Sequence, residues 1–150
     1  MIVNPQYRQV AGFAGSVTQS GAVIKSAAAA TRIPAGTPVK YKDGKVVALE
    51  GTEKAQDIFG IVMKVATPFE PFYPGDLIEV VHEGYVQVAF DEEADAAPVR
   101  GGQVFFDTEK KLFTTDSTKV AVRAIWASDG FGDGIAEVQI FPFIPSAAAA

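Results

Sequence analysis

The stretch from Ile33 to Val65 constrains the fold more than any other part of the chain, because a tight-turn signal lies between two short runs of β-forming residues. Val39–Tyr41 and Val46–Leu49 flank the dipeptide Asp43-Gly44. Asp-Gly favours a hairpin turn, since glycine accepts the positive φ angle that the turn requires. The apolar run Phe59–Met63 follows. The pattern therefore predicts a β-hairpin and a third strand.

A similar pattern returns in the second half of the chain, near Val99. Five positions have counterparts 65 residues further along: Gly36 and Gly101, Val39 and Val104, Tyr41 and Phe106, Lys45 and Lys110, and Val47 and Leu112. The run Ala124-Ile125-Trp126 likewise lies 64 positions after Gly60-Ile61-Val62. We interpret this as a duplicated three-strand unit, with modules at residues 33–65 and 99–128. The alternative is two unrelated hairpins, because β-strand and turn patterns draw on few residue types.

The duplication predicts which residues form the core. Apolar positions shared by both modules should point inward: Val39, Val47, Ile61, Val104, Leu112 and Ile125.

The rest of the chain also favours short strands. Gly21–Lys25 predicts one strand, and the alanine-rich residues 26–31 predict a loop or single turn, because so short a stretch cannot hold an isolated helix. Residues 76–90 predict two strands joined by a turn at Glu83-Gly84, and Ile135–Ile144 predicts a last strand. About nine or ten strands without a convincing helix indicate an all-β domain, either a small Greek-key β-barrel or a jelly-roll-like fold.

The length of 150 residues favours one compact domain, which we place at residues 21–145. Residues 1–20 lack a clean period, so we expect an extended N-terminal arm, with an edge strand plus loop as the alternative. Residues 146–150 are expected to form a disordered tail. With no cysteine, the chain has no disulfide, no thiol nucleophile and no cysteine-built metal site.

The charge pattern argues against nucleic acid as a partner. The net charge is −5, and the lysines are scattered rather than gathered into the basic stripe that phosphate contacts require. No apolar run approaches the ~18 residues of a membrane-spanning helix. The N-terminus shows no basic segment followed by an apolar one, so we expect neither a signal peptide nor a membrane partner.

The sequence gives no support for an enzyme. His82, the single histidine, is predicted to lie at the hairpin turn, and neighbouring residues in a strand such as His82 and Glu83 point to opposite faces. The acidic residues 91–95 and the glycine-rich residues 129–134 match no calcium-binding loop. We therefore expect no catalytic residue, no metal and no cofactor.

Two regions are candidates for an interface, since exposed apolar groups often mark a binding site. The first lies in the arm and comprises Ile2, Val3, Tyr7, Val10 and Phe13. The second is the proline-rich stretch 67–75, with Phe69, Phe72 and Tyr73. A lid packed over one end of a barrel is the alternative interpretation of this second stretch.

The order of these motifs resembles a known family. The segments IPAGTPVKYKDGKVVALEG, FGIVMK, PGDLIEVVHEGYVQVAF and VRGGQVFFDTEKKLFT, from about Gly21 to Phe143, look like the structural cement or head-decoration proteins of tailed bacteriophages. The resemblance implies a small β-barrel or jelly-roll fold without catalytic residues. It also implies a place on the outside of the virion, after synthesis in the host cytoplasm. There a homodimer or homotrimer would bridge neighbouring subunits of the major capsid protein on two-fold or three-fold positions.

A small carbohydrate-binding β-domain is the alternative function. Exposed aromatic residues such as Phe72, Tyr73 or Trp126 would then stack on sugars, although Trp126 lies in an apolar strand and is better explained as core.

The arm hypothesis predicts the effect of a truncation. Deleting Met1–Gln9 should leave the domain folded, because few core contacts are at stake, and should weaken attachment to the capsid or to a sister subunit. The melting curve and the occupancy on particles measure the two effects. Normal occupancy with a normal melting curve would contradict the hypothesis, and a collapsed melting curve would make Met1–Gln9 an ordinary strand.

Overall fold

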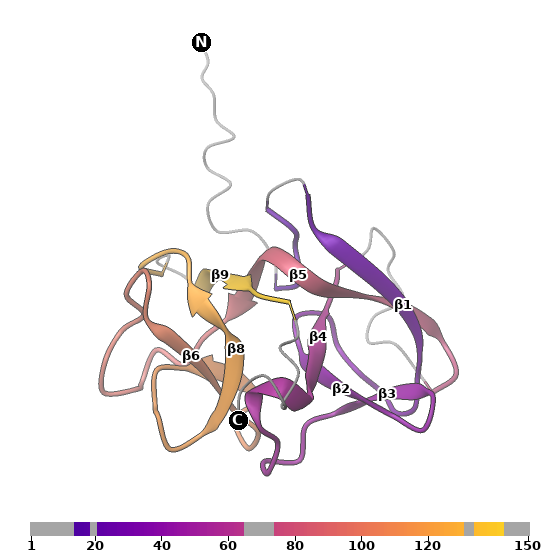
Figure 1. Cartoon of the computed structure of the whole chain (residues 1–150). Coiled ribbons are helices and arrows are strands. Elements are labelled where there is room, and N and C mark those ends of the chain that lie inside the picture. The colour runs from indigo at the N-terminus through magenta and orange to yellow at the C-terminus, as the bar shows by residue number, and fades with distance from the viewer. Residues whose placement is uncertain (1–13, 19–20, 65–73, 131–133, 143–150) are drawn as a thin grey trace.

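The computed structural model describes residues 14–18, 21–64, 74–130 and 134–142, whose regular structure is almost all β-strand (Figure 1). Within these residues there are nine strands and one short 3₁₀ turn, Ala55–Asp57. The strands are β1 (Val23–Ala29), β2 (Pro38–Lys42), β3 (Lys45–Ala48), β4 (Ile58–Val62), β5 (Leu77–Ala89), β6 (Gln103–Asp107), β7 (Leu112–Thr114), β8 (Val120–Trp126) and β9 (Ile135–Ile140). The prediction of an all-β domain is confirmed.

The first five strands close into a barrel, called the first barrel below. The hydrogen-bonded order is β1, β3, β2, β4 and β5, and β5 pairs back to β1. The hairpin of β2 and β3 turns at Asp43-Gly44, where both residues have positive φ angles, as the sequence predicts. The interior of the first barrel is filled by small and branched residues: Ala27, Ala29, Ile33, Val39, Val46, Val62, Ile78 and Val80.

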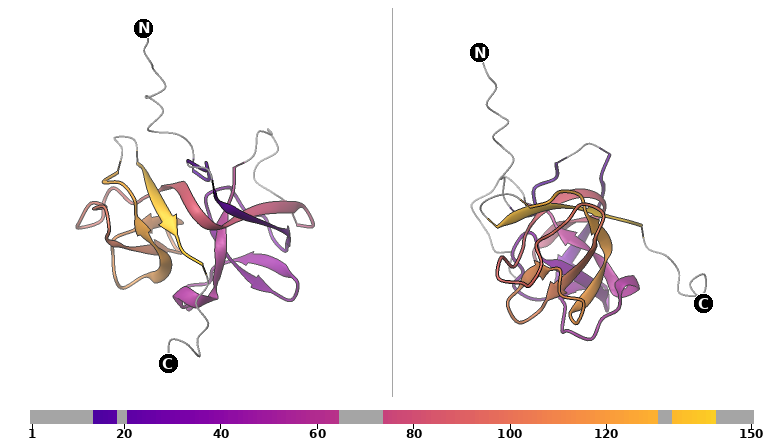
Figure 2. Two further views of the ribbon diagram at one scale, coloured as in Figure 1. Left: turned by 45° about the horizontal axis from the view of Figure 1, so that its top comes forward. Right: turned by 90° about the vertical axis from the view of Figure 1, so that its left-hand side faces the viewer.

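The second half of the chain forms a second ring of the same kind. It runs from β5 through β9, β8 and β6 to β7. A parallel bridge between Phe90, which directly follows β5, and Phe113 of β7 brings the two ends of this order together. Trp126 and Phe113 are the largest side chains buried in its core. In Figure 2 the first barrel and the second ring lie side by side, with β5 running through both.

The predicted turn at Glu83-Gly84 was wrong, because both residues lie within strand β5. The strand continues through this point: Glu83 pairs with Val23 of β1, and Gly84 pairs with Ile140 of β9. Gly84 has a φ of 135°, and a Cβ there would lie 2.9 Å from the Cβ of Ala22. Glycine therefore bends β5 from the first barrel into the second ring without reversing it.

The two halves repeat the same backbone hydrogen bonds. In each half a turn glycine donates to the last residue of the fourth strand, a residue just beyond the first strand donates to the hairpin, and the residue after the fourth strand donates to the fifth strand. The matching pairs are Gly36 to Val62 and Gly101 to Trp126, both 2.8 Å, Ala30 to Val46 at 2.9 Å and Asp91 to Phe113 at 2.8 Å, and Met63 to Glu79 at 2.8 Å and Ala127 to Glu137 at 2.7 Å. The similarity spans five strands, where the sequence pattern indicated three; a common origin of the halves stays a prediction.

The predicted core is half right. Val39, Ile61 and Val104 are fully buried, but Val47, Leu112 and Ile125 are only partly buried. Their neighbours Val46, Phe113 and Trp126 point inward instead. The hairpins differ in loop length, since Lys42 pairs with Lys45 whereas Asp107 pairs with Leu112. A constant offset therefore fails after the turn, and a one-residue error in a strand exchanges the two faces.

The alanine-rich residues 26–31 were also predicted wrongly as a loop or turn. Ala27, Ala28 and Ala29 belong to β1, where pairing with β5 and β3 overrides the helix preference of alanine.

Neighbouring valines in β3 test the assignment of faces. Replacing buried Val46 with Ala should destabilise the protein by about 2 kcal/mol, whereas Val47→Ala should cost well under 1 kcal/mol, because only the first change opens a cavity. Ile61→Ala should cost about 2–5 kcal/mol. Urea unfolding measures all three, and equal costs for the two valine variants would show that the faces are assigned incorrectly.

Candidate functional site

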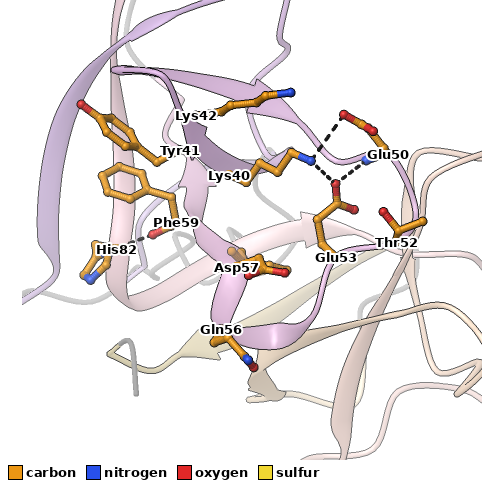
Figure 3. A pocket seen from close by; sticks show the side chains of 11 residues that line it. Lys40, Tyr41, Lys42, Glu50, Thr52, Glu53, Gln56, Asp57, Phe59 and His82 are labelled. Carbon is orange, nitrogen blue, oxygen red and sulfur yellow. Dashed lines mark hydrogen bonds and ion pairs between the residues drawn. The ribbon is translucent and has the colours of Figure 1, made fainter. Parts of the chain in front are cut away.

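A groove of about 560 Å³ lies on the first barrel (Figure 3). Strands β2, β4 and β5 and the loop after β3 supply its walls. Its lining residues are Lys40, Tyr41, Lys42, Glu50, Thr52, Glu53, Gln56, Asp57, Ile58, Phe59 and His82.

One wall of the groove is a row of three rings that are tilted against one another, called the aromatic wall below. Tyr41 lies 5.3 Å from Phe59, and Phe59 lies 5.4 Å from His82, measured between ring centroids. The three rings come from adjacent strands, because β4 pairs with β2 on one edge and with β5 on the other. Tyr41 is 55% exposed, whereas Phe59 and His82 are partly buried. A large exposed aromatic ring that packs against a second ring is typical of a binding surface.

The opposite wall is built on a buried carboxylate, Glu53. Lys40 Nζ lies 2.7 Å from one carboxylate oxygen of Glu53, and the backbone N–H groups of Glu50 and Gly51 donate to the carboxylate at 2.8 and 2.9 Å. Burial opposes ionisation, but the bonds from Lys40 and from the backbone outweigh it and lower the pKa of Glu53 to about 2. The loop after β3 is therefore held in a fixed conformation, which gives the groove a firm wall.

A buried arginine joins the groove to the second ring. Arg123 belongs to β8, yet its guanidinium donates to three backbone carbonyl groups of the first barrel: Ile58 at 3.0 Å, Phe59 at 2.8 Å and His82 at 3.1 Å. Burial lowers the pKa of Arg123 to about 10. In the described part of the chain no carboxylate forms a salt bridge with it, so Arg123 acts as a brace between the halves through backbone carbonyls.

His82 lies in the middle of β5, which corrects its predicted place at a turn. Its Nδ1 atom is 2.7 Å from the carbonyl oxygen of Phe59, which can only accept, so Nδ1 carries the hydrogen. Burial lowers the pKa of His82, and the nearby Arg123 cation lowers it further, against the raising effect of the Phe59 bond. A neutral histidine fixed in this way positions a ring in the aromatic wall.

A second hollow lies on the second ring, around the acidic residues after β5. Its carboxylates bind the chain itself: Asp91 bonds Lys110 Nζ at 2.9 Å, and Asp107 accepts from the backbone of Glu109 at 2.9 Å. The described residues contain no group of three or more His, Asp or Glu side chains that could hold a metal ion. They also contain no helix long and apolar enough to span a membrane.

The residues proposed from sequence as an interface lie outside the described residues: Ile2, Val3, Tyr7, Val10, Phe13, Phe69, Phe72 and Tyr73. Trp126 is 1% exposed, so it is a core residue and has no face for a sugar. The sequence analysis missed the aromatic wall. The available signal was Tyr41, an aromatic residue among lysines at the tip of a predicted hairpin.

Comparison with known proteins agrees with this architecture. The family described as "Structural cement protein (E217 gp24/Pam3 gp6)" matches residues 3–141. No curated protein matches the chain. A chain of the solved structure "The capsid of Myoviridae Phage XM1" is similar in fold, with a TM-score of 0.73 and 20% sequence identity. The match covers 89% of this chain and 92% of that chain.

We expect Arg123→Met to destabilise the protein by about 3 kcal/mol, because the carbonyl groups of Ile58, Phe59 and His82 lose a charged donor. The free energy of unfolding in urea measures the effect. Arg100→Met is the matched control, since it removes the same side chain from an exposed position. Equal stability of the two variants would show that Arg123 does not brace the halves.

Proposed function

The chain belongs to the bacteriophage family of structural cement proteins, and from this premise we propose that it binds the outer surface of a phage capsid and joins neighbouring subunits of the major capsid protein. The match over residues 3–141 carries the proposal, because it includes the first barrel and the second ring. The shared fold with a chain from a phage capsid structure supports it. The family is described as structural, and we propose no enzymatic activity.

The architecture suits a protein that joins two neighbours. Bridging requires two contact surfaces on one body, since binding at the first surface raises the effective concentration at the second. Here the two halves share β5, and Arg123 braces them. Each half can therefore contact a different capsid subunit without a flexible linker between them.

The groove on the first barrel is our candidate for one contact. Exposed tyrosines surrounded by polar residues are enriched among residues that dominate binding energy. Tyr41 is such a residue, and Phe59 supports its ring while Lys42 and Asp57 lie at the rim of the groove. A side chain of the capsid protein that covers Tyr41 would remove an aromatic surface from water.

Further contacts belong to the same proposal. We place the arm residues Ile2, Val3, Tyr7, Val10 and Phe13, and the loop residues Phe69, Phe72 and Tyr73, at the capsid or at a sister subunit. Self-association as a homodimer or homotrimer would increase avidity on a symmetric shell. The protein would be made in the host cytoplasm and added to the exterior of the virion.

A small carbohydrate-binding domain is the second candidate function. The exposed ring of Tyr41 favours it, because aromatic rings offer an apolar face and Tyr adds a hydroxyl group. A glycan array separates the two candidates. Binding to a glycan that Tyr41→Ala abolishes, together with no binding to capsids, would select the carbohydrate function.

The main experiment mixes the purified protein with capsids assembled from the major capsid protein of the same phage. The wild type should co-sediment with capsids, and Tyr41→Ala should bind at least about tenfold more weakly, as expected for a central contact. Val99→Ala is the control, since Val99 is exposed on the second ring, away from the groove. Absence of wild-type binding would refute the proposed function, and normal binding of Tyr41→Ala would remove the groove from it.

A further inference from the structure

His82 lies where the first barrel meets the second ring. It belongs to β5, and its ring packs 5.4 Å from the ring of Phe59 on β4, measured between centroids. Its backbone carbonyl accepts a hydrogen bond from Arg123 of β8 at 3.1 Å. One strand of each half therefore contacts β5 at this residue. His82 is also the single histidine of the sequence, so its titration can be measured without a second imidazole.

Two donors share one acceptor at this junction. The carbonyl oxygen of Phe59 lies 2.7 Å from Nδ1 of His82 and 2.8 Å from Nη2 of Arg123. The two nitrogen atoms are 3.4 Å apart. Nδ1 carries the hydrogen of the neutral ring, so a further proton binds Nε2 and gives the whole ring a positive charge. Protonation thus places two cations in contact beside one carbonyl group, where they repel each other.

The surroundings of His82 favour its neutral form. Burial lowers the pKa of His82, and the cations of Arg123 and Lys25 lower it further. The bond to the Phe59 carbonyl and the negative charge of Glu83 raise the pKa, but they do not outweigh the lowering effects. The charges on β1, β5 and β8 therefore act together against a charged imidazole.

The groove does not change this balance. Its other charged lining residues are Lys40, Lys42, Glu50, Glu53 and Asp57. Both glutamates pair with Lys40, and Asp57 accepts from the backbone N–H group of Lys54. In Figure 3 these carboxylates lie apart from the His82 ring, toward Lys40 and the loop after β3. They are bonded to the groove itself, so a protonated ring gains the repulsion of Arg123 without gaining one of them as a partner.

We propose that His82 is a pH-sensitive switch at the junction between the first barrel and the second ring. The neutral ring shares the Phe59 carbonyl with Arg123 and keeps the junction closed. Protonation at Nε2 turns this shared contact into repulsion between β5 and β8, and it disturbs the ring on which Phe59 rests in the aromatic wall. Mild acid therefore loosens the junction and the groove together. This inference concerns the protein alone and does not depend on the proposed function.

The direction of the pH dependence follows from which state binds the proton. In the unfolded chain the pKa of His82 is about 6.5, which is above its pKa in the folded protein. Between the two values the unfolded chain binds more protons, so the free energy of unfolding falls as the pH falls. The stabilising effect of the neutral ring is complete above the unfolded pKa and is lost progressively below it.

NMR titration of the single imidazole tests the contact with Arg123. The Cε1–H resonance of His82 should titrate with a midpoint below pH 6.5. In Arg123→Gln, which keeps N–H donors but removes the charge, the midpoint should move up toward 6.5. Lys25→Gln is the control and should move it less, because Lys25 is the weaker of the two cationic influences. A wild-type midpoint at or above 6.5, or an unchanged midpoint in folded Arg123→Gln, would overturn the proposal.

Urea unfolding at pH 7.5 and pH 5.0 tests the effect on stability and needs no change at Arg123. His82→Asn is the matched variant, because its amide N–H can replace Nδ1–H toward the Phe59 carbonyl but the side chain cannot become charged. The urea midpoint of the wild type should decrease more between the two pH values than that of His82→Asn. The carboxylates and the α-amino group are common to both proteins and cancel in this comparison. Equal decreases would refute the switch.

Hydrogen exchange at the same two pH values shows whether the loosening is local. In the wild type the protection factors of β4 amides should fall at pH 5.0 by more than those of the β6–β7 hairpin, because β4 carries the carbonyl groups that Arg123 bonds. His82→Asn should show no such difference. Equal loss of protection in β4 and in the hairpin would mean that acid lowers only the global stability, and unchanged protection of β4 would mean that the junction stays closed. Either result overturns the proposal.

Discussion

Strand β5 is the element on which the rest of the structure depends. It is the last strand of the first barrel and the first strand of the second ring, so each half completes its hydrogen bonding only through it. Gly84 allows this double use, because a side chain there would collide with Ala22 and an ordinary residue rarely adopts its φ of 135°. One strand thereby replaces the linker that two separate small barrels would need, and the halves cannot move apart without breaking sheet hydrogen bonds.

Local signals in the sequence predicted the local structure well. The Asp43-Gly44 turn set the first hairpin, and alternating apolar residues identified most strands. The failures concern long-range pairing. The sequence does not show that Ala29 meets Val46 or that Phe90 meets Phe113, and these parallel contacts turn two sheets into rings. Gly84 resembled a turn because a glycine that bends a strand and a glycine that reverses it look the same in one sequence.

The candidate site was harder to predict because its residues come from separate strands. Tyr41, Phe59 and His82 become neighbours only through the order β2, β4, β5, which no local pattern reveals. Tyr41 lies one residue before the end of β2, and its ring is exposed at the surface. The sequence placed His82 at a turn, whereas it lies in the middle of β5.

The buried charged groups hold backbone segments in place in both halves. Glu53 and Asp107 accept hydrogen bonds from backbone N–H groups, and Arg123 donates to backbone carbonyls. Their charges are therefore satisfied by the chain that they hold in place. The ring of Tyr41 remains exposed on the first barrel and packs against Phe59. A rigid scaffold that presents an exposed aromatic ring offers a partner a contact that costs little ordering of the protein itself.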